Sequence, residues 1–188
     1  MPNRDTNTNS GKPEVNEALA EHKTDDLQQN IQFGPYKWRV LDRQGNKALL
    51  ITENVLENCI FHGNFTSVTW ETCDLRKYLN NDFLQKFSID EQRQIAEISI
   101  TNPNNPQYGT SGGENTTDKV FLLSIEEAQR YFVDDNDRKA IDWWWLRSPG
   151  HSSGLVACVD GEGFINAYGY NAYDIHLCGP RPALMICQ

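Results

Sequence analysis

The side chains best suited to covalent chemistry in this 188-residue chain are its five cysteines and four histidines. A cysteine that attacks a substrate needs a nearby base, so Cys158 with His176 is the pair that a nucleophilic mechanism would use. The sequence identifies no third group that would orient such a base. We therefore do not expect catalysis from this pair.

The same residues give little support for a metal site. The cysteines lack the paired C-x-x-C spacing of zinc sites, and no two histidines stand four residues apart on a helix. They are expected to be free thiols, at Cys59, Cys73, Cys158, Cys178 and Cys187. Nucleotide-binding and hydrolase motifs such as G-x-x-x-x-G-K-[ST] and G-x-S-x-G do not occur. We expect a non-enzymatic protein without cofactor or metal.

The charge balance excludes another class of partner. Lys and Arg number 17 against 26 Asp and Glu, for a net charge of -9. Nucleic-acid binders concentrate Lys and Arg on one face, and this chain has no basic cluster. No signal peptide and no bilayer-spanning apolar run is found, so membrane insertion is not expected. We predict a cytoplasmic or phage-virion-associated protein.

The chain divides into a tail and one domain. Residues 1–30 are polar and are expected to be disordered or partly helical, with a weak apolar stripe between Glu14 and Gln29. Residues 31–188 form the predicted domain, which is long enough to bury a core. The stripe, together with exposed apolar residues in the domain, favours a homo-oligomer.

Local patterns predict the first elements of this domain. The β-rich runs Tyr36–Asp42 and Lys47–Thr52 flank a Gly-containing turn and predict a hairpin. Apolar residues recur every three or four positions over Glu71–Phe87, which predicts a helix. Ser88 and Ser124 each open a capping box, S-I-D-E and S-I-E-E, that starts a further helix.

The segments between these elements are read from composition. Pro, Gly and Asn over Thr101–Asp118 predict a long polar loop. Lys119–Leu123 reads as a short apolar strand, and the acidic run Asp134–Asp137 as a solvated turn. A tryptophan run then opens the C-terminal quarter, and at least one of its rings should be buried.

The C-terminal quarter, Trp143–Leu184, mixes residue types in an unusual way. Small or apolar residues alternate with aromatics, aliphatics, a cysteine and acids, which predicts short strands with one buried and one exposed face. Exposed apolar clusters normally mark a contact site. Arg147 and Arg181 stand beside Pro or Gly at the two ends and are interpreted as structural.

Several motifs together resemble a known family. YKWRVLD, ALLIT, DLRKYLNNDF, VFLLSIEEA, WWLRSPG and a closing RPAL occur in the order typical of a bacterial and phage domain family of unassigned function. The resemblance runs from about Phe33 to Ile186. It implies an α+β domain with the C-type lectin-like fold of formylglycine-generating enzymes, two main helices and small twisted antiparallel sheets. A Pro stands before Arg181 where the family usually has Val.

Some members of this fold class are variable proteins of diversity-generating retroelements, in which template adenines are randomised. An Asn codon treated in this way cannot become Lys, Gln, Glu, Met or Trp. Over His151–Arg181 the one residue from that set is Glu162. The resemblance thus implies a variable ligand-binding segment, residues 151–178. Its candidate binding residues are His151, Leu155, Cys158, Asp160, Phe164, Asn166, Tyr168, Tyr170, Tyr173, Asp174, Ile175, His176 and Leu177.

The sequence therefore predicts a receptor-like or adhesin-like binding protein for a protein or cell-surface ligand. Aromatic residues would act as anchors and polar residues would add specificity. The opposing interpretation places individual tyrosines in the core. Three other functions stay open: an undiversified domain with one fixed partner, an oxidase of the formylglycine-generating type, and a calcium lectin. The cysteine pair that formylglycine-generating enzymes use is not recognised in the sequence. Nor are the sugar-binding motifs of calcium-dependent lectins.

Overall fold

The structure is a computed structural model that describes residues 30–57, 59–64, 66–174 and 178–187. The predicted tail, apart from Asn30, and its helical stripe lie outside the described residues. Asn30 already belongs to the first strand, β1 (Asn30–Phe33). The first described strand therefore starts at the last residue of the predicted tail.

The predicted hairpin is confirmed. Strands β2 (Tyr36–Gln44) and β3 (Lys47–Thr52) pair antiparallel, and Gln44 lies opposite Lys47. Gly45 in the connecting turn has a φ of 60°, a conformation that residues with a Cβ rarely adopt. Strand β2 is two residues longer than predicted, because the ladder continues up to the turn.

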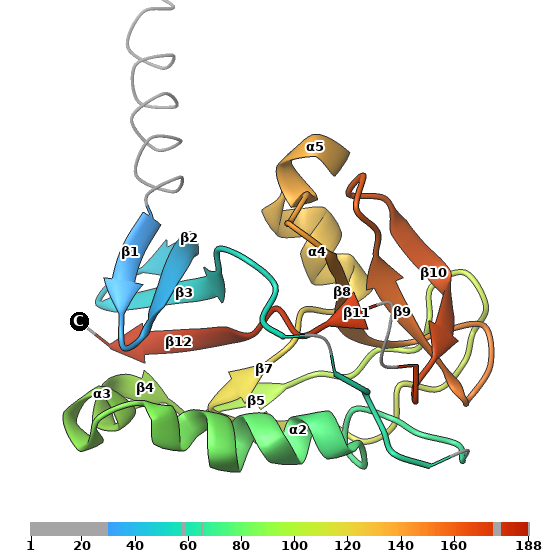
Figure 1. Ribbon diagram of the computed structural model, residues 1–188, viewed down its shortest axis with the longest axis horizontal. Helices are drawn as coiled ribbons and strands as arrows, with labels where there is room; N and C mark the ends of the chain where they lie inside the picture. The colour runs from blue at the N-terminus through green and yellow to red at the C-terminus, as the bar shows by residue number, and fades with distance from the viewer. Residues whose placement is uncertain (1–29, 58, 65, 175–177, 188) are drawn as a thin grey trace, which may run out of the picture.

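The last strand of the chain holds the largest sheet together. Strand β12 (Ala183–Cys187) pairs with β3 on one side and with β4 (Ile95–Ala96) and β7 (Val120–Phe121) on the other. The sheet order is β1-β2-β3-β12-β4, with β7 also on β12. The closing RPAL motif thus lies at the centre of the fold (Figure 1).

A helical run borders this sheet. It comprises α2 (Asp74–Tyr78), a π-helical turn (Leu79–Phe83) and a 3-10 turn (Leu84–Lys86). The helix starts three residues later than the predicted Glu71, because Cys73 has an extended backbone and caps the helix. Its sulfur accepts a hydrogen bond from the Arg76 N–H. The apolar face of the run is buried, as predicted, with Leu75, Leu79, Phe83 and Phe87 in the core.

Both predicted capping boxes are present. Ser88 caps α3 (Ile89–Gln94) and Ser124 caps α4 (Ile125–Tyr131), each with reciprocal hydrogen bonds to the Glu three residues later. The acidic run proves to be more than a solvated turn. It forms the short helix α5 (Asp135–Arg138), and Asp137 pairs with Arg39 of β2 at 2.8 Å. An acid that bonds a strand in this way ties the two regions together.

The polar loop is shorter than predicted. Residues Thr116–Asp118 form β6, which pairs with β5 (Ile98–Ile100) in a separate two-stranded sheet. The predicted strand at Lys119–Leu123 contracts to β7. At the end of β6, the buried Asp118 carboxylate accepts from Trp70, Thr116 and Arg76. These bonds compensate the cost of burying its charge.

The second main sheet carries the C-terminal segment. Its order is β10-β9-β8-β11. The strands are β8 (Trp143–Pro149), β9 (Leu155–Val159), β10 (Ile165–Asn171) and β11 (Cys178–Gly179). Trp144 and Trp145 are fully buried, and Trp143 is half-buried. The pairing of β11 with β8 is parallel, whereas the sequence predicted antiparallel sheets.

Helices and mostly antiparallel sheets around one continuous hydrophobic cluster make this an α+β protein. Figure 1 shows the large sheet and the C-terminal sheet side by side, with α4 and α5 above the latter. Within the described residues, no helix combines the length and apolar character needed to cross a bilayer.

Candidate ligand-binding surface

Strand β10 is the edge of the C-terminal sheet, and it carries much of the predicted binding segment. Its partner β9 is a central strand, with β8 on its other side. An edge strand leaves one side free for a partner, whereas a central strand is hydrogen-bonded on both sides. The two strands of the segment are therefore placed in different surroundings.

The structure separates the predicted binding residues by exposure. The exposed residues are His151, Phe164 and Tyr168; the half-buried ones are Leu155, Asp160, Asn166, Tyr170, Tyr173 and Asp174. Cys158 is fully buried. The remaining three predicted residues, Ile175, His176 and Leu177, lie outside the described residues.

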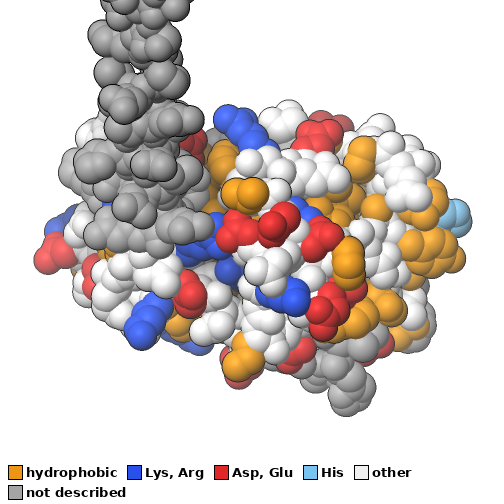
Figure 2. All heavy atoms as spheres, turned by 90° about the horizontal axis from the view of Figure 1, so that it is seen from above, with side chains coloured by type: hydrophobic (Ala, Val, Ile, Leu, Met, Phe, Trp, Pro, Cys, Tyr) orange, Lys and Arg blue, Asp and Glu red, His pale blue; other side chains and the backbone are white. Residues whose placement is uncertain are grey.

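Three aromatic rings meet on the exposed side of β10. His151 stacks on Tyr168 with ring centroids 4.9 Å apart and 13° between planes. Tyr108 meets both rings edge-on, at 4.8 Å from His151 and 5.9 Å from Tyr168. We call Tyr108, His151 and Tyr168 the aromatic cluster. Figure 2 shows hydrophobic side chains gathered beside a histidine at the end of the molecule where β10 lies in Figure 1.

Sequence reasoning missed Tyr108 as a member of this surface. The loop that carries it is fixed to β10 by Asn105, whose side-chain amide donates to the carbonyls of Pro149 and Ala167, each at 2.8 Å. Thr110 also donates to the His151 carbonyl at 2.8 Å. The one available signal was that Tyr108 is the sole aromatic residue in an otherwise polar loop.

A bulge in β10 directs Tyr168 outward. The register with β9 shifts between Asn166 and Tyr170, and Gly169 within the bulge has a φ of 82°. A Cβ on Gly169 would lie 2.5 Å from the Val156 carbonyl oxygen. The Asn166 side chain accepts from the Gly169 N–H at 3.1 Å. Asn166 therefore has a structural role in the bulge.

A tight turn between β9 and β10 presents Phe164, which is 56% exposed. The Asp160 carboxylate accepts from the N–H groups of Glu162 and Phe164, each at 2.9 Å. Arg138 of α5 donates to the Gly163 carbonyl at 3.0 Å, which fixes the turn from outside. Asp160 thus holds the backbone that displays Phe164.

Cys158 does not lie on the exposed face that the sequence predicted for it. It is 0% exposed, and the residues around it in β9, Val156–Val159, are all buried. The strand is covered on both faces, so period-two alternation does not apply. The five consecutive apolar residues of β9 are the signal that would have identified a fully buried strand.

The structure also brings Cys158 into contact with Cys178 of β11, which spacing did not predict. A hydrogen bond to the Cys158 thiol and burial both raise the pKa of Cys178. Both side chains are fully buried. Since the thiolate is the reactive form of cysteine, the raised pKa disfavours attack by Cys178, and burial keeps both sulfurs away from a substrate.

Tyr170 lies on β10, two residues after Tyr168. Its ring meets Trp143 at 5.4 Å between centroids, so the ring is partly covered by the tryptophan run. Tyr173 and Asp174 follow β10 and are half-buried. These three residues are therefore less accessible to a ligand than His151 and Tyr168 of the aromatic cluster.

Arg147 is structural, as predicted, and joins three segments beneath the surface. It is buried, donates to the carbonyls of Leu122 and Thr101, and forms an ion pair with Glu127 of α4. A planar guanidinium can satisfy several acceptors at once, which suits this position.

Arg181 has the same kind of role at the other end of the segment. It is buried and donates to the carbonyls of Thr52 and Arg138, while its guanidinium lies 5.1 Å from the Trp144 ring centroid. Burial lowers the pKa of Arg181 to about 10. Both prediction and structure thus assign the two arginines to the scaffold.

A model of one protein family matches most of this fold, namely a domain of unknown function, DUF6273, over residues 45–188. The chain belongs to this family. The DUF6273 match covers both main sheets from β3 onward, including every exposed residue of the binding segment. Neither a curated protein nor a solved structure matches the chain.

The described part of this DUF6273 chain contains no group of three His, Cys, Asp or Glu residues arranged to hold a metal ion. What the geometry offers at β10 is a rigid surface of exposed rings. Such rings suit binding by stacking and apolar contact.

Proposed function

We propose that the chain is a non-enzymatic binding protein whose contact surface is the aromatic cluster together with Phe164. The observation that carries this proposal is the grouping of three exposed rings beside an edge strand: His151 stacks on Tyr168, Tyr108 meets both edge-on, and Tyr168 is 53% exposed. Monomeric surfaces seldom expose grouped aromatic side chains without a partner. Tyr and Phe also lose little side-chain entropy on binding, so they serve well as anchors.

The backbone beneath this surface supports the same function. Asn105, Asp160 and Asn166 each bond backbone groups next to an exposed ring, which holds the ring positions before a ligand arrives. Preorganisation of this kind lowers the entropic cost of binding. We propose a receptor-like or adhesin-like role with a protein or cell-surface ligand.

We further propose that the scaffold is C-type lectin-like. The WWLRSPG motif forms the buried strand β8 and RPAL leads into the central strand β12, so these two motifs of the family resemblance lie in the core. The exposed residues lie between them. This division suits a fixed scaffold that displays a changeable surface.

A more specific version of the proposal is that a retroelement diversifies this surface. The burial of each residue limits the positions at which diversification is compatible with the fold. His151, Phe164 and Tyr168 are exposed and lie outside the buried core, so substitution at these positions leaves the core packing intact. Cys158 is in the core, where randomisation would disturb packing. We therefore propose diversification at the exposed positions of segment 151–178 and not at Cys158.

An undiversified domain with one fixed partner is the second candidate. Asp160 and Asn166 favour it, because their side chains already bond the local backbone and both residue types suit tight turns. Their agreement with the codon restriction thus has a structural explanation. A reverse-transcriptase gene and a near-repeat of the segment beside the gene would favour diversification, and their absence would favour the fixed partner.

The binding proposal is tested with the aromatic cluster itself. Full-length protein is applied to arrays of bacterial surface proteins and glycans, next to Tyr168→Ala and the matched control Ile89→Ala, which removes an exposed apolar side chain from α3. We expect Tyr168→Ala to weaken a detected interaction about tenfold or more, as for an interface anchor. Equal loss in both variants, or no loss in Tyr168→Ala, would contradict the proposal.

A further inference from the structure

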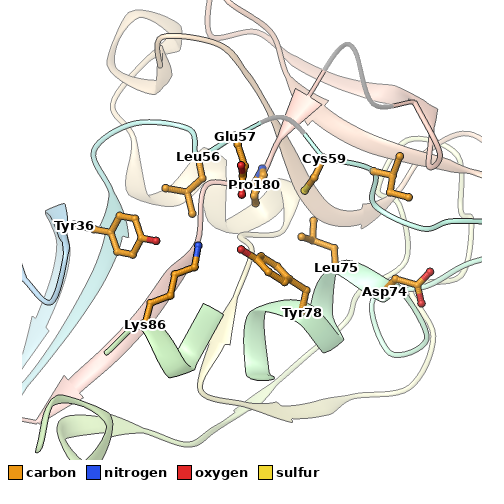
Figure 3. A pocket seen from close by; sticks show the side chains of 10 residues that line it. Tyr36, Leu56, Glu57, Cys59, Asp74, Leu75, Tyr78, Lys86 and Pro180 are labelled. Carbon is orange, nitrogen blue, oxygen red and sulfur yellow. The ribbon is translucent and has the colours of Figure 1, made fainter. Parts of the chain in front are cut away.

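A pocket of about 570 Å³ lies away from the aromatic cluster, between the start of β2, the segment after β3 and helix α2. Figure 3 shows side chains around this space from these elements, from Lys86 of the 3-10 turn and from Pro180, just before β12. The volume falls within the range of small-molecule sites. The pocket is separate from the proposed binding surface on β10.

Most of the wall is apolar. Leu56, Ile60, Leu75 and Pro180 line it, and the Cys59 thiol adds a further weakly polar group. Burial of Cys59 and the nearby charge of Glu57 raise the pKa of that thiol to about 11, so it is protonated at neutral pH. This wall therefore suits a hydrocarbon or aromatic body, which gains free energy by leaving water.

One end of the pocket is polar and positively charged. Lys86, Tyr36 and Tyr78 line it, and their side-chain polar atoms point toward one another (Figure 3). The Lys86 ammonium also lies 5.9 Å from the Tyr78 ring centroid and 5.8 Å from that of Phe83. A hydrogen bond with Tyr78 raises the pKa of Lys86, so it is a cation at neutral pH.

The charge of Lys86 is left available for a ligand. Among the residues that the structure describes, Lys86 forms no salt bridge. The acids in the lining are Glu57 and Asp74, and Asp74 already pairs with Lys77 and His62. An ammonium beside two hydroxyl groups offers several donors to one small anion.

We propose that this pocket binds a small organic monocarboxylate with an apolar body. The carboxylate lies at Lys86 and the two tyrosine hydroxyls, and the body lies against Leu56, Ile60 and Pro180. A monoanion is favoured over a phosphate dianion, because one cation faces the site and the carboxylates of Glu57 and Asp74 would repel a second negative charge.

The test uses 3-phenylpropionate as the probe and its neutral amide as the isosteric control. Full-length protein is titrated with each compound while backbone amide NMR shifts are followed. We expect saturable shifts around Tyr36, Leu56 and Tyr78, with the acid binding about tenfold more tightly than the amide because it gains charge-assisted hydrogen bonds. Equal affinity for acid and amide, or shifts confined to other regions, would overturn the proposal.

Two matched variants locate the charge. Lys86→Gln removes the ammonium at the pocket, whereas Lys37→Gln removes an exposed ammonium from β2, next to Tyr36, that does not line the pocket. Both lysines are exposed, so both variants should fold. We expect Lys86→Gln to abolish the preference for the acid and Lys37→Gln to keep it. An unchanged preference in Lys86→Gln would contradict the assignment. Failure here would leave the binding surface on β10 unaffected.

Discussion

Strands β9 and β10 are adjacent in sequence and hydrogen-bonded to each other, but they serve opposite purposes. From Val156 to Val159, β9 is buried, whereas β10 carries the exposed Tyr168 ring and a glycine bulge. The two strands differ in pairing, since β9 is central and β10 is an edge, and also in covering, since the edge strand β11 of the same sheet is buried. A segment that reads as one variable surface is thus divided into a core strand and a display strand. The predictions below test that division.

The largest effect is expected from placing a charge in β9. Cys158→Asp buries a carboxylate without a partner, and we expect a loss of roughly 4 kcal/mol or more in the free energy of unfolding. The matched change Tyr168→Asp on β10 should cost about 1–2 kcal/mol, because this side chain is 53% exposed and loses only its ring contacts with His151 and Tyr108. Urea unfolding of both variants measures the contrast. Similar losses in both would show that the strands are not divided in this way.

The bulge of β10 is tested by two glycines. Gly169→Ala forces a Cβ into a φ of 82° and to within 2.5 Å of a carbonyl oxygen, and we expect a loss of about 2–4 kcal/mol. Gly154→Ala is the control, because its Cβ would meet nothing within 4 Å. Thermal unfolding should separate the two variants clearly. A Gly169→Ala protein as stable as Gly154→Ala would remove the argument for a fixed bulge.

The turn that displays Phe164 depends on Asp160. Asp160→Ala removes the acceptor of two backbone N–H groups, and we expect a loss of about 1–2 kcal/mol. Glu162→Ala removes only an exposed ion pair with Lys139 and should cost about 0–1 kcal/mol. Urea unfolding compares them. A larger loss in Glu162→Ala would contradict the role of Asp160.

The last comparison is between the alkylation rates of buried and half-buried cysteines. Iodoacetamide on the native protein should leave Cys158 and Cys178 unmodified, since both are fully buried. Cys59 is half-buried with a pKa of about 11, so its alkylation should be slow at neutral pH and rise roughly tenfold per pH unit up to about pH 10. Mass spectrometry of peptides reads each site. Rapid native labelling of Cys158 would show that β9 is accessible.

The features that the sequence predicted well are those encoded locally. The hairpin depends on a Gly turn between two β-rich runs, and the capping boxes depend on a Ser and a Glu three residues apart. The scaffold role of Arg147 and Arg181 followed from their Pro and Gly neighbours. Each of these signals lies within a few residues, so no knowledge of distant contacts was needed.

The features that were missed depend on contacts between distant residues. The packing of Tyr108 on His151 requires a loop bonded to β10 through Asn105, and the contact of Cys158 with Cys178 requires β11 beside β8. The ion pair between Arg39 of β2 and Asp137 of the acidic run also joins residues far apart in the sequence. Burial of one face or both faces of a strand is likewise set by what covers it, which periodicity alone does not reveal.

The most direct test of the division between β9 and β10 uses two libraries. In each, the chosen codons are replaced by Asn codons whose adenines are randomised. One library varies His151, Phe164 and Tyr168; the other varies Cys158 with its neighbours Val156 and Ala157 in β9. Each is displayed on phage and challenged with protease to measure the folded fraction. The account predicts that most members of the first library stay folded and that few of the second do. Equal tolerance in both libraries would contradict a core strand beside a display strand.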